Sequence, residues 1–274
     1  MNLAMNVTKQ LHCSKTALIT GASSGIGYEF AKLFARDRYN LVLIARSEEK
    51  LTEMADELSR NFGISVRNIV KDLSIPASPE EIFKELQQAA IQVDVLVNNA
   101  GFATYGFFFE TNLTVELQMM QLNMVALTHL SKLLLPSMLQ RYEGKILNVS
   151  STAAFQPGPM MAVYYATKAY VLSFSEALAN EVRGSGVTVT AFCPGPTASG
   201  FQKQAAMEQS KLVSGRRIMD AATVAKIGYE GLMKNQTIVI PGLKNRLLTL
   251  SIRFTPRNLV TQLVRNMQER VDSN

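Results

Sequence analysis

Two residues of this chain, Tyr164 and Lys168, have the types and the spacing of an acid–base pair. On a helix, side chains four positions apart lie on one face, so the phenol and the ammonium group would be neighbours. A free phenol has a pKa of about 10, too high for efficient proton transfer at neutral pH. A nearby ammonium group favours the phenolate and lowers that pKa. The pair therefore predicts a general acid and base, and the hydroxyls of Ser150 and Ser151 lie upstream in the sequence.

A glycine-rich segment near the N-terminus could bind phosphate. Gly21, Gly25 and Gly27 follow a predicted strand and open a predicted helix, where backbone N–H groups can approach a pyrophosphate. The spacing is Gly-x-x-x-Gly-x-Gly rather than the commoner Gly-x-Gly-x-x-Gly. Any tight strand-to-helix turn can also use glycines, so this segment alone supports both a dinucleotide site and a plain turn.

The elements that must position these residues follow from an alternation along the chain. Short β-branched runs alternate with longer periodic segments, which predicts an α/β fold with a doubly wound parallel sheet flanked by helices in a single domain, 1–274. We expect seven strands, at 16–20, 40–45, 65–71, 93–98, 145–149, 187–192 and 237–240. We expect helices at 26–38, 48–61, 79–90, 113–141, 160–182 and 222–234, with Ser47 capping the second.

Two segments depart from the alternation. Residues 195–220 are weakly periodic and predict a lid beside a binding cleft. Residues 241–274 form a C-terminal helical appendage with most of the excess positive charge, six basic residues and one acidic residue between 244 and 270. Leu259, Val260, Leu263, Val264 and Met267 recur on one helical face there. Such a basic amphipathic segment could lie on an anionic membrane, but we favour packing on the chain's own body or on a second subunit.

Composition limits the other function classes. Most of the net charge of +6 belongs to the tail, so the body carries no nucleic-acid signal. Cys13 and Cys193 form no CxxC or metal-ligand cluster, and we expect neither a disulfide framework nor a metal site. His12 and His129 have no convincing catalytic partners. We expect no signal peptide, no transmembrane segment and a cytoplasmic location.

Taken in order, the motifs resemble the short-chain dehydrogenase/reductase family over about residues 14–240. They are Thr20-Gly21-x-x-x-Gly25-x-Gly27, Asn98-Asn99-Ala100-Gly101, Ser151, Tyr164-x-x-x-Lys168 and Pro194-Gly195. The resemblance implies a Rossmann-like sheet with a nicotinamide cofactor lying across the carboxyl ends of the strands. It also implies a homodimer or homotetramer formed through the helices at 113–141 and 160–182.

The resemblance assigns roles to the catalytic candidates. It implies that Tyr164 exchanges the proton, that Ser151 hydrogen-bonds the reacting oxygen, and that Lys168 holds the nicotinamide ribose. Asn123 matches the fourth position and implies a water-linked proton path. Geometry alone leaves Tyr165 and Ser150 as alternatives, because Tyr165 also shares the face of Lys168; the family spacing selects Tyr164 and Ser151.

The resemblance also implies a set of cofactor-binding residues. They are Gly21, Ser23, Ser24, Gly25, Ile26, Gly27, Arg46, Asp72, Leu73, Asn98, Ala100, Gly101, Tyr164, Lys168, Pro194, Gly195 and Thr197. Ala45 stands where NAD-preferring members place an acid, and Arg46 follows it. A 2′-phosphate needs a cation there, so we expect NADP(H), although Arg46 could also be a solvated residue ahead of a helix.

The expected function is an NADPH-dependent oxidoreductase acting on a carbonyl or secondary alcohol. The expected substrate wall is apolar, made of Phe102, Tyr105, Phe107, Phe108, Phe155, Met160, Met161, Phe201 and Met207. A hydrophobic ketone, an aldehyde, a steroid-like molecule or a 3-oxoacyl chain would suit it. A 3-oxoacyl thioester reductase is the close alternative, and a non-catalytic NADP(H)-binding sensor is the alternative from another class.

Overall fold

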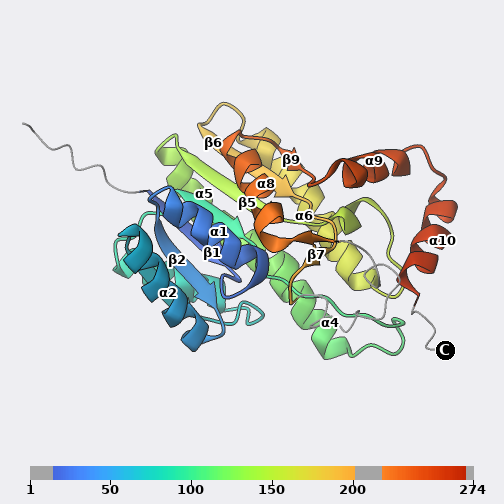
Figure 1. Cartoon of the computed structure of the whole chain (residues 1–274), viewed down its shortest axis with the longest axis horizontal. Helices are drawn as coiled ribbons and strands as arrows, with labels where there is room; N and C mark the ends of the chain where they lie inside the picture. Colours follow the sequence, from blue (N-terminus) through green and yellow to red (C-terminus); the bar gives the residue numbers. More distant parts are fainter. Residues whose placement is uncertain (1–14, 201–217, 270–274) are drawn as a thin grey trace, which may run out of the picture.

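The computed structural model describes residues 15–200 and 218–269, and its centre is a seven-stranded parallel sheet (Figure 1). The strands are β1 (Thr16–Thr20), β2 (Asn40–Ala45), β3 (Val66–Val70), β4 (Val95–Asn98), β5 (Gly144–Val149), β6 (Val187–Phe192) and β9 (Ile238–Val239). Their order is β3-β2-β1-β4-β5-β6-β9, so the chain winds outward in both directions from β1 and β4. The predicted doubly wound sheet is confirmed, and its strand order reverses between β1 and β4, where such sheets bind ligands.

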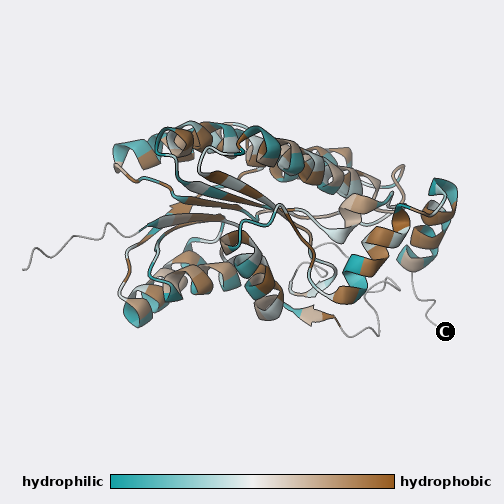
Figure 2. Ribbon diagram, turned by 90° about the horizontal axis from the view of Figure 1, so that it is seen from above, coloured by the Kyte–Doolittle hydropathy of each residue, from teal (hydrophilic) through white to brown (hydrophobic). Residues whose placement is uncertain are grey.

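Helices cover both faces of the sheet, which lies between two helical layers in Figure 2. Helices α1 (Gly25–Arg36), α2 (Glu48–Phe62) and α8 (Ala221–Met233) bury side chains such as Phe30 and Leu51 against one face. Helices α3 (Ser78–Gln88), α5 (Leu127–Gln140) and α6 (Ala162–Glu181) bury Ile82 and Leu130 against the other. Burial on both faces explains why the strands are nearly continuous apolar runs.

The long helix predicted over 113–141 is divided in the structure. Helix α4 (Leu113–Met120) passes through a π-helical turn, Gln121–Ala126, into α5. The turn holds Asn123, whose side chain bonds the backbone of Phe102 in a neighbouring loop. Such wide turns often mark functional positions. Among the described residues, Leu113–Gln140 is also the one helix long and apolar enough to cross a membrane, yet its Leu130 and Leu134 pack in the core under the sheet.

The two ends of the predicted lid pair with each other. Thr197–Ala198 forms β7 and Met219–Asp220 forms β8, and the two strands are parallel. The lid residues Phe201 and Met207 lie outside the described residues, as do His12 and Cys13. The pairing was not predicted, because strands of two residues leave no periodic pattern in a sequence.

The C-terminal appendage forms two helices at one end of the molecule, α9 (Leu243–Ile252) and α10 (Arg257–Gln268) (Figure 1). Of the predicted apolar face, Val260 and Val264 are buried in a cluster with Met161, Tyr164 and Tyr165. The other half of that face is exposed, since Leu259 and Leu263 lie about half in solvent. The appendage therefore packs on its own body through one side only.

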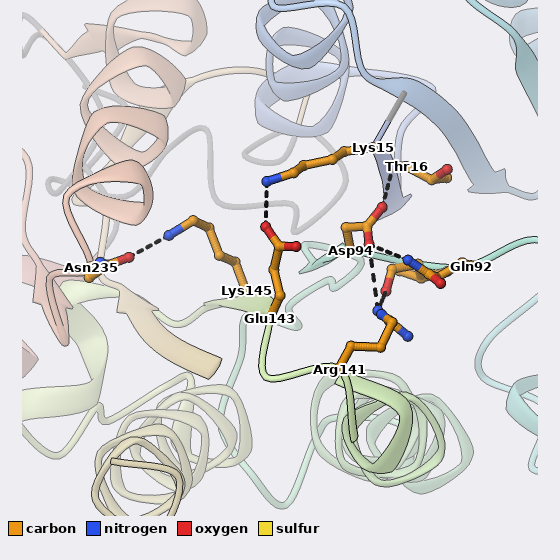
Figure 3. A network of polar contacts seen from close by, with 9 residues as sticks. Lys15, Thr16, Gln92, Asp94, Arg141, Glu143, Lys145 and Asn235 are labelled. Atoms are coloured by element: carbon orange, nitrogen blue, oxygen red, sulfur yellow. Dashed lines mark hydrogen bonds and ion pairs between the residues drawn. The ribbon is translucent and has the colours of Figure 1, made fainter. Parts of the chain in front are cut away.

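The amino ends of the strands are joined by a network of polar contacts (Figure 3). The carboxylate of Asp94 accepts hydrogen bonds from the backbone N–H of Thr16 and from Gln92, at 2.8 and 2.9 Å, and forms an ion pair with Arg141 at 3.5 Å. Beside it, Lys15 pairs with Glu143, and Lys145 donates to Asn235. These contacts link β1, β4 and β5 at the edge opposite the site described next.

Candidate active site

A large cavity lies at the carboxyl ends of the strands. Its volume is about 1210 Å³, above the ~300–1,000 Å³ usual for small-molecule sites. It runs from Arg46 after β2, past Tyr164 and Lys168, to Met267 in α10. Of the predicted site residues, its walls include Gly21, Ser23, Ser24, Gly25, Ile26, Arg46, Asp72, Leu73, Ala100, Gly101, Ser151, Tyr164, Lys168, Pro194, Gly195 and Thr197. The structure thus brings together residues that the sequence separates by almost 200 positions.

The glycine turn is shaped for close backbone approach. Gly21 and Gly25 have φ values of +64° and +55°, which side chains disfavour, and a Cβ on Gly21 would lie 2.9 Å from the Cα of Ala100. Gly27 does not line the cavity; a Cβ there would lie 2.3 Å from the carbonyl oxygen of Gly21. Ser24 stands at the N-cap of α1 without a side-chain capping bond. The N-terminus of α1 therefore opens into the cavity and fits an anion such as a pyrophosphate.

Asn98, predicted to bind the cofactor, does not line the cavity, whereas its neighbour Asn99 does. Asn98 is only 3% exposed, and its Nδ2 donates to Asn148 and Ser131 beneath the sheet end. Asn99 lines the cavity, and its Nδ2 donates to the carbonyl oxygens of Thr20 and Gly21 at 2.9 and 3.1 Å. Side chains alternate between the faces of a strand, so adjacent asparagines point in opposite directions. The sequence could not say which one faces the cavity.

A cluster of polar groups lies at the end of β2. Arg46 is exposed, with its Nη1 3.9 Å from the Oδ2 of Asp72, and Lys50, in the first turn of α2, also lines the cavity. Ser47 stands at the N-cap of α2, but its side chain does not make the capping hydrogen bond predicted for it. The sequence did not predict the contribution of Lys50, because a lysine in the first turn of a helix is usually a solvated surface residue. Two cations and an uncapped helix N-terminus suit a phosphate group.

The Tyr164 phenol sits in a buried position beside Ser151. Burial raises the pKa of Tyr164 above its ordinary value, and a hydrogen bond with Ser151 acts in the opposite direction. In the protein without its cofactor, burial therefore outweighs this hydrogen bond. The lowering of the pKa that we expect comes from Lys168 together with the positive ring of an oxidised nicotinamide cofactor.

Lys168 is held close to this phenol. Its Nζ lies 5.8 Å from the centroid of the Tyr164 ring and donates to the carbonyl oxygen of Val149 at 2.8 Å. Burial lowers the pKa of Lys168 to about 8. The lysine can therefore change its charge near neutral pH, which suits a group that assists proton transfer.

The structure distinguishes Tyr164 and Ser151 from Tyr165 and Ser150, the alternatives that helix and strand geometry left open. Ser150 is buried and donates to the backbone carbonyl of Lys168 at 2.8 Å, whereas Ser151 hydrogen-bonds Tyr164. The Tyr165 hydroxyl accepts from Nε2 of Gln268 at 2.6 Å, an interaction with the C-terminal helix. The hydroxyls of Ser150 and Tyr165 therefore bond other parts of the chain, whereas Ser151 and Tyr164 bond each other in the wall of the cavity.

Asn123 lies behind the pair and does not line the cavity. Its Oδ1 accepts from the N–H of Phe102 at 3.2 Å, and its Nδ2 donates to the carbonyl of Phe102 at 3.0 Å and to Thr167 at 3.1 Å. A Cβ on Gly101 would lie 2.9 Å from this Oδ1 and 3.5 Å from the Nζ of Lys168. Asn123 therefore positions the loop that passes Lys168.

Of the apolar residues predicted to form the substrate wall, Phe102 and Met161 line the cavity. Phe108 is exposed, Phe155 packs in a separate cluster, and Tyr105, Phe107 and Met160 do not line the cavity either. The sequence did not reveal the contribution of α10. Gln268 is fully buried and bonds Tyr165, its carbonyl accepts from Tyr105, and Met267 lines the wall. A glutamine at the end of an amphipathic helix does not differ in the sequence from an ordinary solvated residue, so the sequence could not predict this contact.

Comparison with known proteins agrees with this geometry. The family model described as short chain dehydrogenase matches residues 15–210. A very-long-chain 3-oxoacyl-CoA reductase of Anas platyrhynchos is 34% identical over 194 residues, covering 68% of this chain and 61% of that protein. The chain therefore spans less than two thirds of that curated relative.

Solved structures are similar over nearly the whole chain. A short-chain dehydrogenase from Sphingobium yanoikuyae in complex with NADPH has a TM-score of 0.80 at 30% identity, covering 95% of this chain and 98% of that one. A bulky-bulky ketone specific alcohol dehydrogenase from Comamonas testosteroni has a TM-score of 0.76 at 28% identity, covering 95% and 97%. This chain is an oxidoreductase that belongs to the short-chain dehydrogenase family.

Proposed function

We propose that this protein is an NADP(H)-dependent reductase of a hydrophobic ketone or related carbonyl compound. The observation that carries the proposal is the grouping of Ser151, Tyr164 and Lys168 in one wall of a cavity that begins at an open helix N-terminus. A sensor that only binds nucleotide would not need this grouping, which argues against the non-catalytic alternative.

The residues that line the cavity fit a phosphorylated dinucleotide. The N-terminus of α1 would hold the pyrophosphate, and Arg46 and Lys50 would hold a 2′-phosphate. Asp72 and Leu73 would meet the adenine, and Pro194, Gly195 and Thr197 would contact the nicotinamide end. The Sphingobium yanoikuyae structure, which contains NADPH, supports this cofactor.

The chemistry then follows from the positions of the side chains. The bound cofactor would supply hydride to the carbonyl carbon. Tyr164 would give its proton to the carbonyl oxygen, and Ser151 would hydrogen-bond the same oxygen. Lys168, charged below pH about 8, would stabilise the phenolate that remains. Asn123 would keep the loop at Phe102 in place, which supports the expected proton path behind Lys168.

A 3-oxoacyl thioester is the second candidate substrate. The name of the Anas platyrhynchos relative supports it, and the ketone named for the Comamonas testosteroni enzyme supports a bulky ketone instead. Both agree with a long cavity whose far wall carries Phe102, Met161, Leu248 and Met267. The two substrates differ in the charged carrier that a thioester brings, which makes them separable by experiment.

The test is NADPH oxidation by the purified chain with matched ketones, aldehydes and 3-oxoacyl thioesters, followed by absorbance. Turnover that disappears in Tyr164→Phe and persists in Tyr165→Phe would support the reductase. Tight NADPH binding without turnover across the whole panel would favour the sensor.

We also propose that the chain forms homo-oligomers through α4, the π-helical turn and α6. Leu113, Leu117, Val125 and Tyr170 lie exposed on these helices. Their exposure favours a partner, because burying large apolar side chains stabilises association. Size-exclusion chromatography with light scattering would give the mass, and Leu117→Glu with Val125→Glu should reduce it.

A further inference from the structure

We propose that α9 and α10 bind an anionic lipid bilayer, at the end of the molecule where the substrate cavity is closed by the same two helices. The proposal concerns an interaction surface and does not depend on the proposed reductase activity. It rests on how apolar, polar and basic residues are distributed around α9.

The outward face of α9 is an uninterrupted apolar stripe. Leu243, Leu247 and Leu250, followed by Phe254 just beyond the helix, recur at intervals of four, three and four residues. At about 100° per residue they fall within about 60° of one another. They are 72, 58, 51 and 82% exposed, respectively. Four large apolar side chains on one exposed face are unusual for a helix that serves only to pack on its own body.

The opposite face of α9 is already occupied by the body of the protein. Asn245 packs against Gly195, where a Cβ would lie 2.6 Å from its Nδ2. Thr249 is buried, Leu248 lines the cavity and Ile252 packs on the cluster around Tyr164. Leu243 is exposed but also borders the cavity, whereas Leu247, Leu250 and Phe254 do not line it. The helix is therefore held with these three side chains pointing outward, and a rearrangement to bury them would expose the wall of the cavity.

Basic residues flank the stripe on both sides. Lys244 lies to one side of it, and Arg246 and Arg253 lie to the other. Long basic side chains beside an apolar stripe can extend to lipid phosphates while their stems lie along the acyl region. From 241 to 268 the chain has five basic residues and no acidic one. This pattern of charge complements an anionic lipid surface.

Other elements at this end of the molecule also expose apolar side chains. Leu259 and Leu263 on α10 are about half exposed. In the loop before α4, Phe107 stacks on Phe109 and lies under the guanidinium of Arg265 at 5.3 Å, and Phe109 itself is 83% exposed. These side chains add apolar groups that a bilayer could contact besides those of α9.

A second copy of the chain is the other possible occupant of this surface. Two copies meeting through it would bring ten positive charges together without an acidic residue between 241 and 268 to offset them. Positive charges brought together across an interface repel one another, whereas an anionic bilayer attracts positive charges. The charge pattern therefore favours lipid over self-association.

The experiment is co-sedimentation of the full-length protein with vesicles of phosphatidylcholine alone and of phosphatidylcholine with phosphatidylglycerol. We expect binding to the anionic vesicles that weakens as salt increases. The triple variant Leu247→Ser, Leu250→Ser, Phe254→Ser should lower the partition coefficient at least about ten-fold. The pair Arg253→Gln, Arg257→Gln should lower binding to anionic vesicles only.

Matched controls use exposed residues elsewhere. Ile75→Ser with Tyr142→Ser removes exposed apolar groups from the body, and Arg60→Gln with Lys84→Gln removes exposed basic groups there. Both controls should bind vesicles as the wild type does. Circular dichroism and thermal unfolding would show that the variants are folded.

Three results would overturn the proposal. They are equal partitioning of the stripe variant and the wild type, absence of wild-type binding to anionic vesicles, and a fall in oligomeric mass of the stripe variant measured by sedimentation velocity without lipid. The last result would assign the surface to a second copy of the chain.

Discussion

The amino ends and the carboxyl ends of the parallel strands form two edges of the sheet, called here the amino edge and the carboxyl edge. Polar side chains at these two edges serve opposite purposes. At the amino edge, polar groups bond one another. Asp94 accepts hydrogen bonds from Thr16 and Gln92 and forms an ion pair with Arg141 (Figure 3). At the carboxyl edge, two helices begin at serines without side-chain capping bonds, and Lys168 is buried with a lowered pKa. Groups that satisfy one another contribute to stability, and groups aimed at a cavity are available to a ligand. Substitutions at the two edges should therefore affect different measurements.

The largest difference is expected from Tyr164→Phe at the carboxyl edge. Without the phenol the group that we propose to protonate the reacting oxygen is lost, and kcat should fall by about 10²- to 10⁴-fold. NADPH affinity, measured by fluorescence titration, should change little. Tyr165→Phe should keep most activity because its hydroxyl bonds Gln268. The reverse pattern would mean that the two tyrosines are wrongly assigned.

Arg46→Asp should change cofactor choice rather than chemistry. Replacing the cation with a carboxylate removes a charge-assisted bond and repels a 2′-phosphate, so the preference for NADPH over NADH should fall by about 10- to 100-fold. The ratio of kcat/KM values measures it. Arg60→Asp, near the end of α2, the helix that follows Arg46, and outside the cavity wall, is the control. An unchanged ratio for Arg46→Asp would contradict the NADP(H) proposal.

Asp94→Ala tests the amino edge. The substitution removes the partner of the Thr16 N–H and of Arg141, and the free energy of unfolding should fall by about 1–3 kcal/mol. Chemical denaturation measures this loss, and kcat should stay at the wild-type value. Asp94→Asn keeps an oxygen acceptor and should lose less stability. A large fall in kcat with unchanged stability would erase the distinction between the two edges.

The smallest effect is expected from Glu143→Gln, which breaks the exposed ion pair with Lys15. Solvent screens such pairs, so the loss should stay below about 1 kcal/mol. Lys15 lowers the pKa of Glu143, which makes the pair stabilising above the ordinary carboxyl pKa. As pH falls through the lowered value, the carboxylate is protonated and the contribution disappears. The difference from wild type, followed by denaturation at several pH values, should therefore vanish in acid.

The sequence predicted the layers of the fold well because parallel strands and their helices leave local, periodic patterns. The seven strands and their helices lie where expected, apart from small shifts at their ends, such as β3 beginning at Val66. The π-helical turn around Asn123 was not predicted, because it has the apolar composition of the helix on either side. What distinguishes it is a contact with Phe102, 21 positions away.

The sequence predicted those residues of the candidate site that come directly after a strand. Gly21, Ser151 and Pro194 each come after a strand and line the cavity, as a parallel sheet requires. Gln268 was not predictable, because it reaches Tyr165 from 103 positions along the chain. The choice between Asn98 and Asn99 depended on strand orientation, which a sequence of two identical residues does not reveal.

The pairing of β7 with β8 has a consequence for how such enzymes could diversify. Thr197 lies beside Met219 and Ala198 beside Asp220, so the chain leaves this place and returns to it. Closing a longer excursion between fixed ends costs little extra entropy, since each doubling of length adds only about 0.6 kcal/mol. The intervening segment can thus be exchanged for one of another length or composition while the sheet keeps its register. Such an exchange would leave Tyr164 in its place on α6, because that helix lies outside the segment between β7 and β8.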